Sequence, residues 1–322
     1  MRYGIIGLTA IGLALLAPTA KADLVLSGPT TGAGSYSTAE LAAMANAGNT
    51  VTDATLGLTG ISLWSLLGGT SGITTSTPAG DNSKNAILRY YLVGSGGGQT
   101  SVVSAGEINP SFGNKSVFVA YETSGGSLLA TPELIVPGAA GRDVTKLGSL
   151  VLTSAPARPS SSGGQSTTVT LSGSVTNPGT YSLADLQAMP ALSTTLPGTS
   201  TTYQGTSLFG FIDPTGDVLN EIVTTVGTDG YTVAFAAAEL DPAYGGDPSD
   251  ILAYASNAGD FPGAGIARTI IPGDTPNKHG RWMSNLDAIT VTDVPEPASM
   301  TVLAGALGLL GWVRRRAARL PV

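Results

Sequence analysis

Short segments in which polar and apolar residues alternate recur along the chain, separated by turns rich in glycine and proline. Residues 168–175 alternate in this way, and the turn Asn177-Pro178-Gly179 follows them. A period of two residues places alternate side chains on opposite faces of a strand, so this segment predicts a half-buried strand. Segments rich in Val and Ile predict further strands at 222–226, 231–235, 251–254, 268–271 and 288–291.

Short helices are predicted where a serine precedes apolar residues spaced three apart. Ser182 is followed by Asp185, and Ser37 is followed by Glu40 at the same spacing. This arrangement is a capping box, in which two side chains satisfy free amides at the start of a helix. Another short helix is predicted around residues 207–212. The pattern as a whole predicts an α+β fold that is mainly β, with short peripheral helices.

The first 22 residues have the parts of a secretory signal peptide. Arg2 supplies a positive start, residues 5–18 are almost wholly apolar, and Ala20 and Ala22 form a small-residue cleavage site. An uncleaved anchor is the alternative, but the apolar run is shorter than the roughly 20 residues that a spanning helix needs. The segment therefore predicts export through the inner membrane, with signal peptidase as a processing partner.

A second apolar segment, residues 298–313, lies near the C-terminus and is followed by Arg314, Arg315, Arg316 and Arg319. Arginines next to an apolar segment hold that end in the cytoplasm, so the segment predicts a short transmembrane helix. A buried C-terminal helix of a soluble domain is the alternative. It would not account for four arginines within six residues.

The composition excludes several kinds of functional site and partner. Only 11% of the 322 residues are charged, and 44 Gly and 20 Pro favour chain reversals over helix interiors. Cysteine is absent, which excludes disulfides, thiolate metal ligands and cysteine nucleophiles. Six of the 15 basic residues but one of the 22 acidic residues lie outside 23–293, leaving this body 9 basic against 21 acidic groups and a net charge of −12. A surface of that sign repels phosphate backbones, so no nucleic-acid partner is expected.

The chain contains an internal repeat. Residues 34–44 (GSYSTAELAAM) match residues 179–189 (GTYSLADLQAM) at a shift of 145, and 135–138 (IVPG) match 270–273 (IIPG) in the same order. A repeat of this length predicts two homologous domains. The expected organisation is a signal peptide at 1–22, repeat domain 1 at 23–153, a Pro/Ser/Gly linker at 154–166, repeat domain 2 at 167–293 and a sorting tail at 294–322.

The tail resembles the PEP-CTERM sorting signal. A Val-Pro-Glu-Pro motif, an apolar segment and an arginine cluster stand in the family's order, at Val294, Pro295, Glu296, Pro297, residues 298–313, Arg314, Arg315 and Arg316. The resemblance implies recognition by an exosortase in a Gram-negative bacterium, a transient membrane anchor and loss of the tail. It further implies delivery to the cell surface or the extracellular space, with exopolysaccharide as a partner there.

Each repeat resembles the molybdopterin-binding domain of the sulfite oxidase type, more clearly in the second copy. The segments that carry the resemblance are 171–175, 181–186, 204–208, 229–231, 251–254, 268–273 and 289–291, together with Glu239 and Lys278. The resemblance implies two tandem mixed domains of that fold, between an N-terminal signal helix and a C-terminal transmembrane helix.

One departure from that family bears on the chemistry. The family's molybdenum-binding cysteine would fall within residues 190–204, which contain Ser and Thr but no Cys. A hydroxyl is a poor substitute for a soft thiolate donor. Arg268, Lys278 and Arg281 could still hold an anionic ligand, although surface charges flanking a strand are the simpler interpretation.

Other candidate sites are weaker. Glu239, Asp241, Asp247 and Asp250 crowd a glycine-containing loop and are a weak candidate for calcium, although they lack EF-hand spacing. His279 is the one histidine of the chain, which excludes a multi-histidine metal site. No catalytic residue and no cofactor are therefore expected.

Two functions remain open from the sequence. The first is a non-catalytic surface or matrix protein that uses the oxidoreductase-like fold as a binding or structural module. The alternative is a protein that holds molybdopterin or another pterin without thiolate ligation. Whether the protein is an enzyme stays open, with the non-catalytic function favoured by the missing cysteine.

Overall fold

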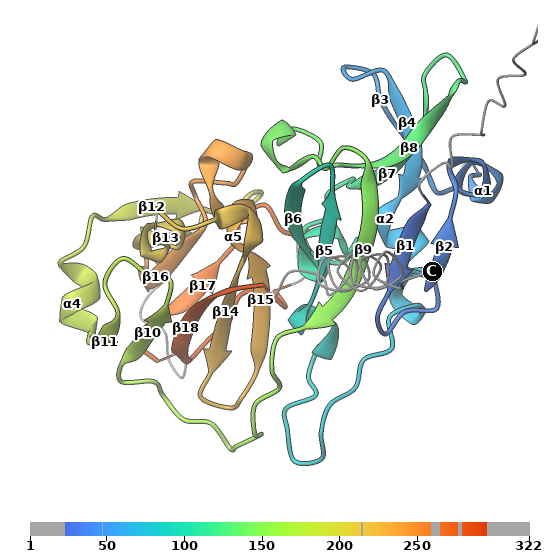
Figure 1. Cartoon of the computed structure of the whole chain (residues 1–322). Helices are drawn as coiled ribbons and strands as arrows, with labels where there is room; N and C mark the ends of the chain where they lie inside the picture. Colours follow the sequence, from blue (N-terminus) through green and yellow to red (C-terminus); the bar gives the residue numbers. More distant parts are fainter. Residues whose placement is uncertain (1–22, 47, 214, 259–264, 276–278, 295–322) are drawn as a thin grey trace, which may run out of the picture.

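A computed structural model of the chain describes residues 23–46, 48–213, 215–258, 265–275 and 279–294 (Figure 1). The predicted signal peptide, its cleavage site and all of the sorting tail after Val294 lie outside the described residues. No helix in the described part of the chain is long and apolar enough to cross a membrane.

Strands β1 to β9 form the first half of the structure. Their bounds are Leu24–Ser27, Gly34–Tyr36, Thr50–Asp53, Leu58–Ser62, Tyr90–Gly96, Gln99–Ser104, Phe118–Thr123, Leu128–Ile135 and Leu147–Ser154. Short helices accompany them: α1 (Thr38–Met44), α2 (Leu63–Leu66) and α3 (Ala105–Ile108), with 3-10 helices η1 (Gly69–Ser71), η2 (Ala86–Arg89) and η3 (Ala140–Arg142).

Strands β10 to β18 form the second half. Their bounds are Val169–Gly173, Gly179–Tyr181, Leu192–Thr195, Thr202–Ser207, Glu221–Gly227, Thr232–Ala236, Ile251–Ser256, Arg268–Ile270 and Leu286–Asp293. The accompanying helices are α4 (Leu183–Gln187), α5 (Ala237–Leu240), η4 (Phe209–Phe211), η5 (Val218–Asn220) and η6 (Pro242–Tyr244). The expected mainly β fold with short helices is confirmed.

The two halves have the same strand order. The five-stranded sheets are β2-β1-β9-β5-β6 and β11-β10-β18-β14-β15, and the four-stranded sheets are β3-β4-β7-β8 and β12-β13-β16-β17. Each strand of the second half takes the place of the strand nine numbers earlier in the first half. Within each half the two sheets share one apolar core. This arrangement agrees with the repeat in the sequence, while independent folding of each half stays a prediction.

The halves pack through the β5–β6 and β14–β15 hairpins (Figure 1). Strand β14 is buried at every residue because its alternate side chains face two cores: Val223 joins the core of the second half, and Ile222 faces the first half. We call this contact the seam and define it by its apolar cluster, Tyr91, Val93, Val102, Ala155, Ile222, Ala234, Ala236 and Val294.

Local predictions agree with the structure except at two places. Both capping boxes are present, at Ser37 with Glu40 and at Ser182 with Asp185. The helix predicted around 207–212 is a single 3-10 turn, η4. The stretch 190–204 contains β12 and the start of β13, which form a hairpin where no strand was predicted; most of its Thr and Ser side chains are exposed or half-buried, and Thr194 is buried.

Candidate functional site

Two glutamates lie at the seam, each on a short helix that directly follows an edge strand. Helix α3 follows β6 and carries Glu107, while α5 follows β15 and carries Glu239. The two residues occupy equivalent places in the two halves. Their exposed fractions are 4% and 8%. A carboxyl group at that depth needs close partners, since a buried charge without them is strongly unfavourable.

Arg142 is the main partner of Glu107. Its Nη1 and Nη2 lie 2.6 and 2.7 Å from the two carboxylate oxygens, and Nη2 also donates to the carbonyl of Val102 at 3.0 Å. Lys115 approaches Glu107 from the more exposed side, with 3.4 Å between Nζ and Oε1. Burial alone would raise the pKa of Glu107, but Arg142 and then Lys115 outweigh it and hold this pKa at about 2. Glu107 is therefore ionised at neutral pH.

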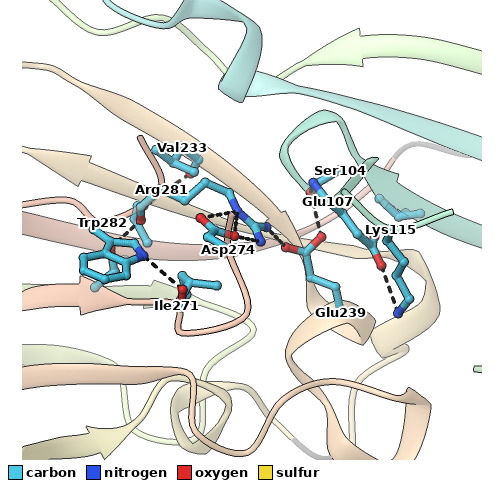
Figure 2. Close-up of polar contacts among 12 residues, drawn as sticks. Ser104, Glu107, Lys115, Val233, Glu239, Ile271, Asp274, Arg281 and Trp282 are labelled. Atoms are coloured by element: carbon cyan, nitrogen blue, oxygen red, sulfur yellow. Dashed lines mark hydrogen bonds and ion pairs between the residues drawn. The ribbon is translucent and has the colours of Figure 1, made fainter. Parts of the chain in front are cut away.

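Arg281 holds the equivalent place in the second half and binds two carboxylates (Figure 2). Its Nη1 lies 2.6 Å from Glu239 Oε1, while its Nε and Nη2 donate to Asp274 at 3.0 and 2.5 Å. Burial lowers the pKa of a guanidinium, but the two carboxylates raise that of Arg281 overall. The guanidinium is thus charged and fully engaged.

A hydrogen bond connects the two clusters across the seam. Ser104 donates from Oγ to Glu239 Oε2 at 2.6 Å, so one hydroxyl both caps α3 and reaches the opposite half (Figure 2). Burial, and next the charge of Glu107, raise the pKa of Glu239 to about 7 against the lowering effect of Arg281. Glu239 therefore changes protonation near neutral pH.

We call this set the charge network and define it as Ser104, Glu107, Lys115, Arg142, Glu239, Asp274 and Arg281. Three cations face three carboxylates within it. Charges balanced in this way leave little to attract an anionic ligand. The four ion pairs each lie within one half, and the Ser104–Glu239 hydrogen bond links the two halves.

Of the three cations proposed from the sequence as ligand-binding, the structure describes Arg268 and Arg281. Arg281 is enclosed by its carboxylates. Arg268 is half-buried with its guanidinium 5.9 Å from the ring centre of Tyr203, and burial lowers its pKa. Lys278 lies outside the described residues.

The four acidic residues of the calcium prediction each make different interactions. Glu239 belongs to the charge network, Asp241 accepts from the amide of Ala243 at the start of η6, and Asp247 accepts from the amide of Ser249. Asp250 is buried at 6% exposure, and burial raises its pKa well above the usual value. Among the residues that the structure describes, no group of three or more Asp, Glu or His side chains is placed to hold a metal ion.

A pocket of about 450 Å³ lies where the two halves and the linker meet, and we call it the junction pocket. Lys84 and Asn85 of the first half, residues 162–164 of the linker, and Tyr231 and His279 of the second half line it. Asn85 Nδ2 donates to Tyr231 Oη at 3.1 Å, which fixes this wall across the halves. Burial raises the pKa of Tyr231 to about 12, so its phenol stays neutral.

The exposed ring of His279 forms part of the floor of the junction pocket. It stacks on Trp282 with 4.1 Å between ring centres and 9° between ring planes. Trp282 is itself fixed by donating from Nε1 to the carbonyl of Ile271 at 3.0 Å. The pocket thus offers a flat ring beside hydroxyl, amide and carbonyl groups, with the charged side chains of Lys84 and Asp229 also in its lining.

The residues do not fit a molybdenum centre of the sulfite oxidase type. The stretch 190–204, where the resemblance places the metal-binding cysteine, offers hydroxyls on the exposed β12–β13 hairpin, and Thr195 and Thr202 hydrogen-bond each other there at 3.0 Å. Such hydroxyls neither ionise near neutral pH nor match a soft metal.

The sequence predictions missed Glu107, Arg142, Ser104, Lys115 and Asp274 as site residues. The first two were detectable from the repeat, since Glu107 corresponds to Glu239 and the pair Gly141-Arg142 corresponds to Gly280-Arg281. Of the residues in the predicted sorting motif, Val294 alone lies within the described part of the chain, where it is buried at 3% exposure.

Comparisons with known proteins agree with the prediction for the tail. The PEP-CTERM protein-sorting motif matches residues 293–317, which confirms that prediction. No curated protein matches the chain. Among the solved structures that match, the sulfane dehydrogenase SoxCD from Paracoccus pantotrophus is similar over 41% of this chain and 39% of its own, with 17% identity and a TM-score of 0.31. The likeness spans less than half of either chain, and no activity follows from it.

Proposed function

We propose that an exosortase sorts this protein to the cell surface, where the folded body serves as a non-catalytic module that binds a neutral, polyhydroxylated ligand. The junction pocket is the observation that carries this proposal. It is large enough for a sugar unit and combines hydroxyl and amide groups with the stacked His279 ring, and one basic and one acidic side chain, Lys84 and Asp229, also line it. Sites for small polar ligands commonly have this combination.

The charge of the body favours a neutral ligand over an acidic one. The net charge of −12 between residues 23 and 293 repels acidic polymers as well as nucleic acids. The buried arginines cannot offset this effect, because Arg142 and Arg281 are each bound by carboxylates. A neutral exopolysaccharide is therefore the proposed partner.

Binding can be tested with polysaccharides of different charge. The purified exported body is run in affinity gels that contain dextran, a neutral polymer, or alginate, an acidic one, and cellohexaose is titrated by calorimetry. We expect retardation by a neutral glycan and none by alginate. Binding to neither dextran nor cellohexaose would refute the proposed ligand class.

A matched pair of variants distinguishes binding in the junction pocket from non-specific binding. Asn85 and Asn114 are both exposed asparagines with positive φ, at 44° and 49°, but only Asn85 lines the junction pocket. Glycine tolerates this backbone conformation, so neither substitution adds strain. We expect Asn85→Gly to weaken glycan binding about tenfold, the effect of roughly one lost hydrogen bond, and Asn114→Gly to leave it unchanged.

The absence of a pterin cofactor is also part of the proposal and has its own test. Molybdenum is measured by mass spectrometry of the purified body, and pterins by fluorescence after oxidation. We expect neither at stoichiometric level, because the oxygen donors of residues 190–204 suit molybdenum poorly. Stoichiometric molybdenum or pterin would refute the non-catalytic binding function and favour the alternative, a protein that holds a pterin.

A further inference from the structure

Another cavity, of about 180 Å³, lies beside the charge network, and we call it the seam pocket. Its charged lining comes from both halves and consists of Glu107, Lys115, Glu239, Asp247, Asp250 and Arg281. Figure 2 shows four of these side chains, Glu107, Lys115, Glu239 and Arg281, close together. Among the described residues, none lines both this cavity and the junction pocket.

The acidic side chains of the seam pocket outnumber the basic ones. The three cations and three carboxylates of the charge network balance one another. Asp247 and Asp250 lie outside that network, between η6 and β16, and add two carboxyl groups to the lining. The seam pocket therefore favours a cation over an anion.

Asp250 presents an acceptor that the protein does not satisfy. Its side chain is 6% exposed, and within the described part of the chain its buried Oδ1 has no hydrogen-bond partner. The backbone is fixed here, because the amide of Asp250 donates to the carbonyl of Asp247 at 3.0 Å and its carbonyl accepts from the amide of Leu208 at 3.0 Å. A buried acceptor without a partner is unfavourable, so a donor in the pocket would stabilise it.

Asp247 supplies a second acceptor at the more exposed side of the pocket. Its Oδ1 accepts from the amide of Ser249 at 2.8 Å. Its Oδ2 lies on the side of Gly273, where a Cβ added to this glycine would be 3.9 Å from it. Because Gly273 lines the seam pocket, this oxygen is placed to meet a ligand there.

The protonation of Asp250 responds to charge in the pocket. Burial raises the pKa of Asp250 well above its usual value, against the lowering effect of Arg281. Asp247, Glu239 and Asp274 also face this carboxyl and raise its pKa further. The protonated form is therefore favoured in the protein alone. A cation beside Oδ1 favours the ionised form, so binding of a cation releases a proton.

A primary ammonium group suits this pocket better than a metal ion does. Calcium takes about six to eight oxygen ligands, whereas no three acidic or histidine side chains of the described residues are placed to hold one metal ion. An ammonium group carries one charge and several N–H donors. A cavity of roughly 150 Å³ holds a benzene molecule, so 180 Å³ leaves room for a chain of a few carbons beside Ile271.

We propose that the seam pocket binds a short primary ammonium ion, whose N–H groups donate to Asp250 Oδ1 and Asp247 Oδ2. The charge of Lys115 does not exclude this ligand, because its Nζ lies 3.4 Å from Glu107 Oε1 and is compensated there. The site is separate from the proposed glycan site, and either one stands if the other fails.

The test is calorimetry on the full-length protein in a non-ionic detergent at pH 7. The ligand is n-butylammonium chloride, and tetramethylammonium chloride and sodium butyrate are the comparisons. We expect n-butylammonium alone to bind, because tetramethylammonium has the charge without an N–H donor and butyrate has the opposite charge. No binding of n-butylammonium, or equally tight binding of either comparison ligand, would overturn the proposal.

Substitutions in the pocket locate the site. Asp250→Asn keeps the shape of the protonated carboxyl but cannot ionise, and we expect it to weaken binding of n-butylammonium at least about tenfold. Asp287→Asn makes the same change at an exposed position of the same half outside the pocket and should leave binding unchanged. Asp247 is exposed, so Asp247→Asn gives a second pocket variant whose folding is not in question, and it should also weaken binding. If Asp250→Asn does not fold, Asp247→Asn decides. Unchanged affinity in the deciding variant would overturn the assignment.

Proton release gives a readout that a merely structural role would not change. The titration is repeated in phosphate and in HEPES, whose ionisation enthalpies differ, so that the protons released on binding can be counted. We expect Asp250→Asn to release fewer protons than the parent protein, while Glu239, with its pKa of about 7, contributes equally in both. A proton count that the substitution leaves unchanged would show that the ammonium group does not bind beside Asp250.

Discussion

Replacing Arg142 by methionine is expected to destabilise the protein by about 3–5 kcal/mol. Arg142 is completely buried and makes two short contacts to Glu107 and one to the carbonyl of Val102. Methionine restores much of the volume but leaves Glu107 as a buried charge. Lys115 stays beside it, with 3.4 Å between Nζ and Oε1. Removing one partner of a buried ion pair costs about this much because the other charge loses its compensation.

The assay is urea unfolding followed by circular dichroism at pH 7. Arg158→Met is the matched control, because the same chemical change at an exposed linker position should alter the free energy of unfolding by no more than about 0.5 kcal/mol. The double variant Arg142→Met/Glu107→Gln removes both charges and should recover most of the loss. A loss below about 1 kcal/mol, or a double variant no more stable than the single one, would refute the role assigned to this pair.

The pH dependence of this loss gives an independent check. Arg142 keeps the pKa of Glu107 near 2 in the folded protein, below the 4.5 of a free glutamate. This pair therefore stabilises the protein above about pH 4.5, and its contribution disappears as the pH falls towards 2. Without Arg142, burial raises this pKa and the carboxyl protonates early. The difference between the two proteins should therefore shrink on acidification, and a difference independent of pH would contradict the electrostatic explanation.

Three further results are expected. The pKa of Glu239 is raised to about 7, so its contribution to the free energy of unfolding should fall as the pH rises from about 4.5 to 7. Glu239→Gln should therefore flatten this part of a pH series of urea unfolding curves, and an unchanged slope would count against the assignment. Ser182→Ala should lower the midpoint of thermal unfolding by removing about 1 kcal/mol of helix capping, and no shift would mean that the cap is dispensable. Gly173→Ala should destabilise by several kcal/mol in the same assay, since φ is +83° and a Cβ would lie 1.8 Å from the carbonyl oxygen of Val291; a stable variant would contradict this close packing.

Local structure was largely predictable because its causes are local. A capping box needs two side chains three residues apart, and both examples, at Ser37 and at Ser182, form as expected. Strand β14 was predicted at 222–226 from its Val and Ile residues and spans Glu221–Gly227. The hairpin of β12 and β13 was missed because its strands are rich in Thr and Ser and lack the Val and Ile residues that mark the other strands; β12 pairs with β13, and β13 pairs with β16.

The charge network was beyond local rules because its partners are far apart in the sequence. Glu107 and Arg142 are separated by 35 residues, and Ser104 and Glu239 by 135 residues. Spacing along a chain carries no information about such contacts. Arg281 was a candidate for holding an anionic ligand, with a surface charge flanking a strand as the simpler interpretation. The structure shows it buried at 5% exposure, and its anionic partners are the protein's own carboxylates.

The central place of β18 bears on the order of events during export. A chain that crosses the membrane with its amino terminus first delivers this strand after every other part of the body. Until then the second sheet has β10 and β14 with a gap between them, since each of these strands pairs directly with β18. The first half meets no such delay, because β9 precedes the linker and can complete its own sheet early. The second sheet therefore closes only when the last strand of the body has arrived.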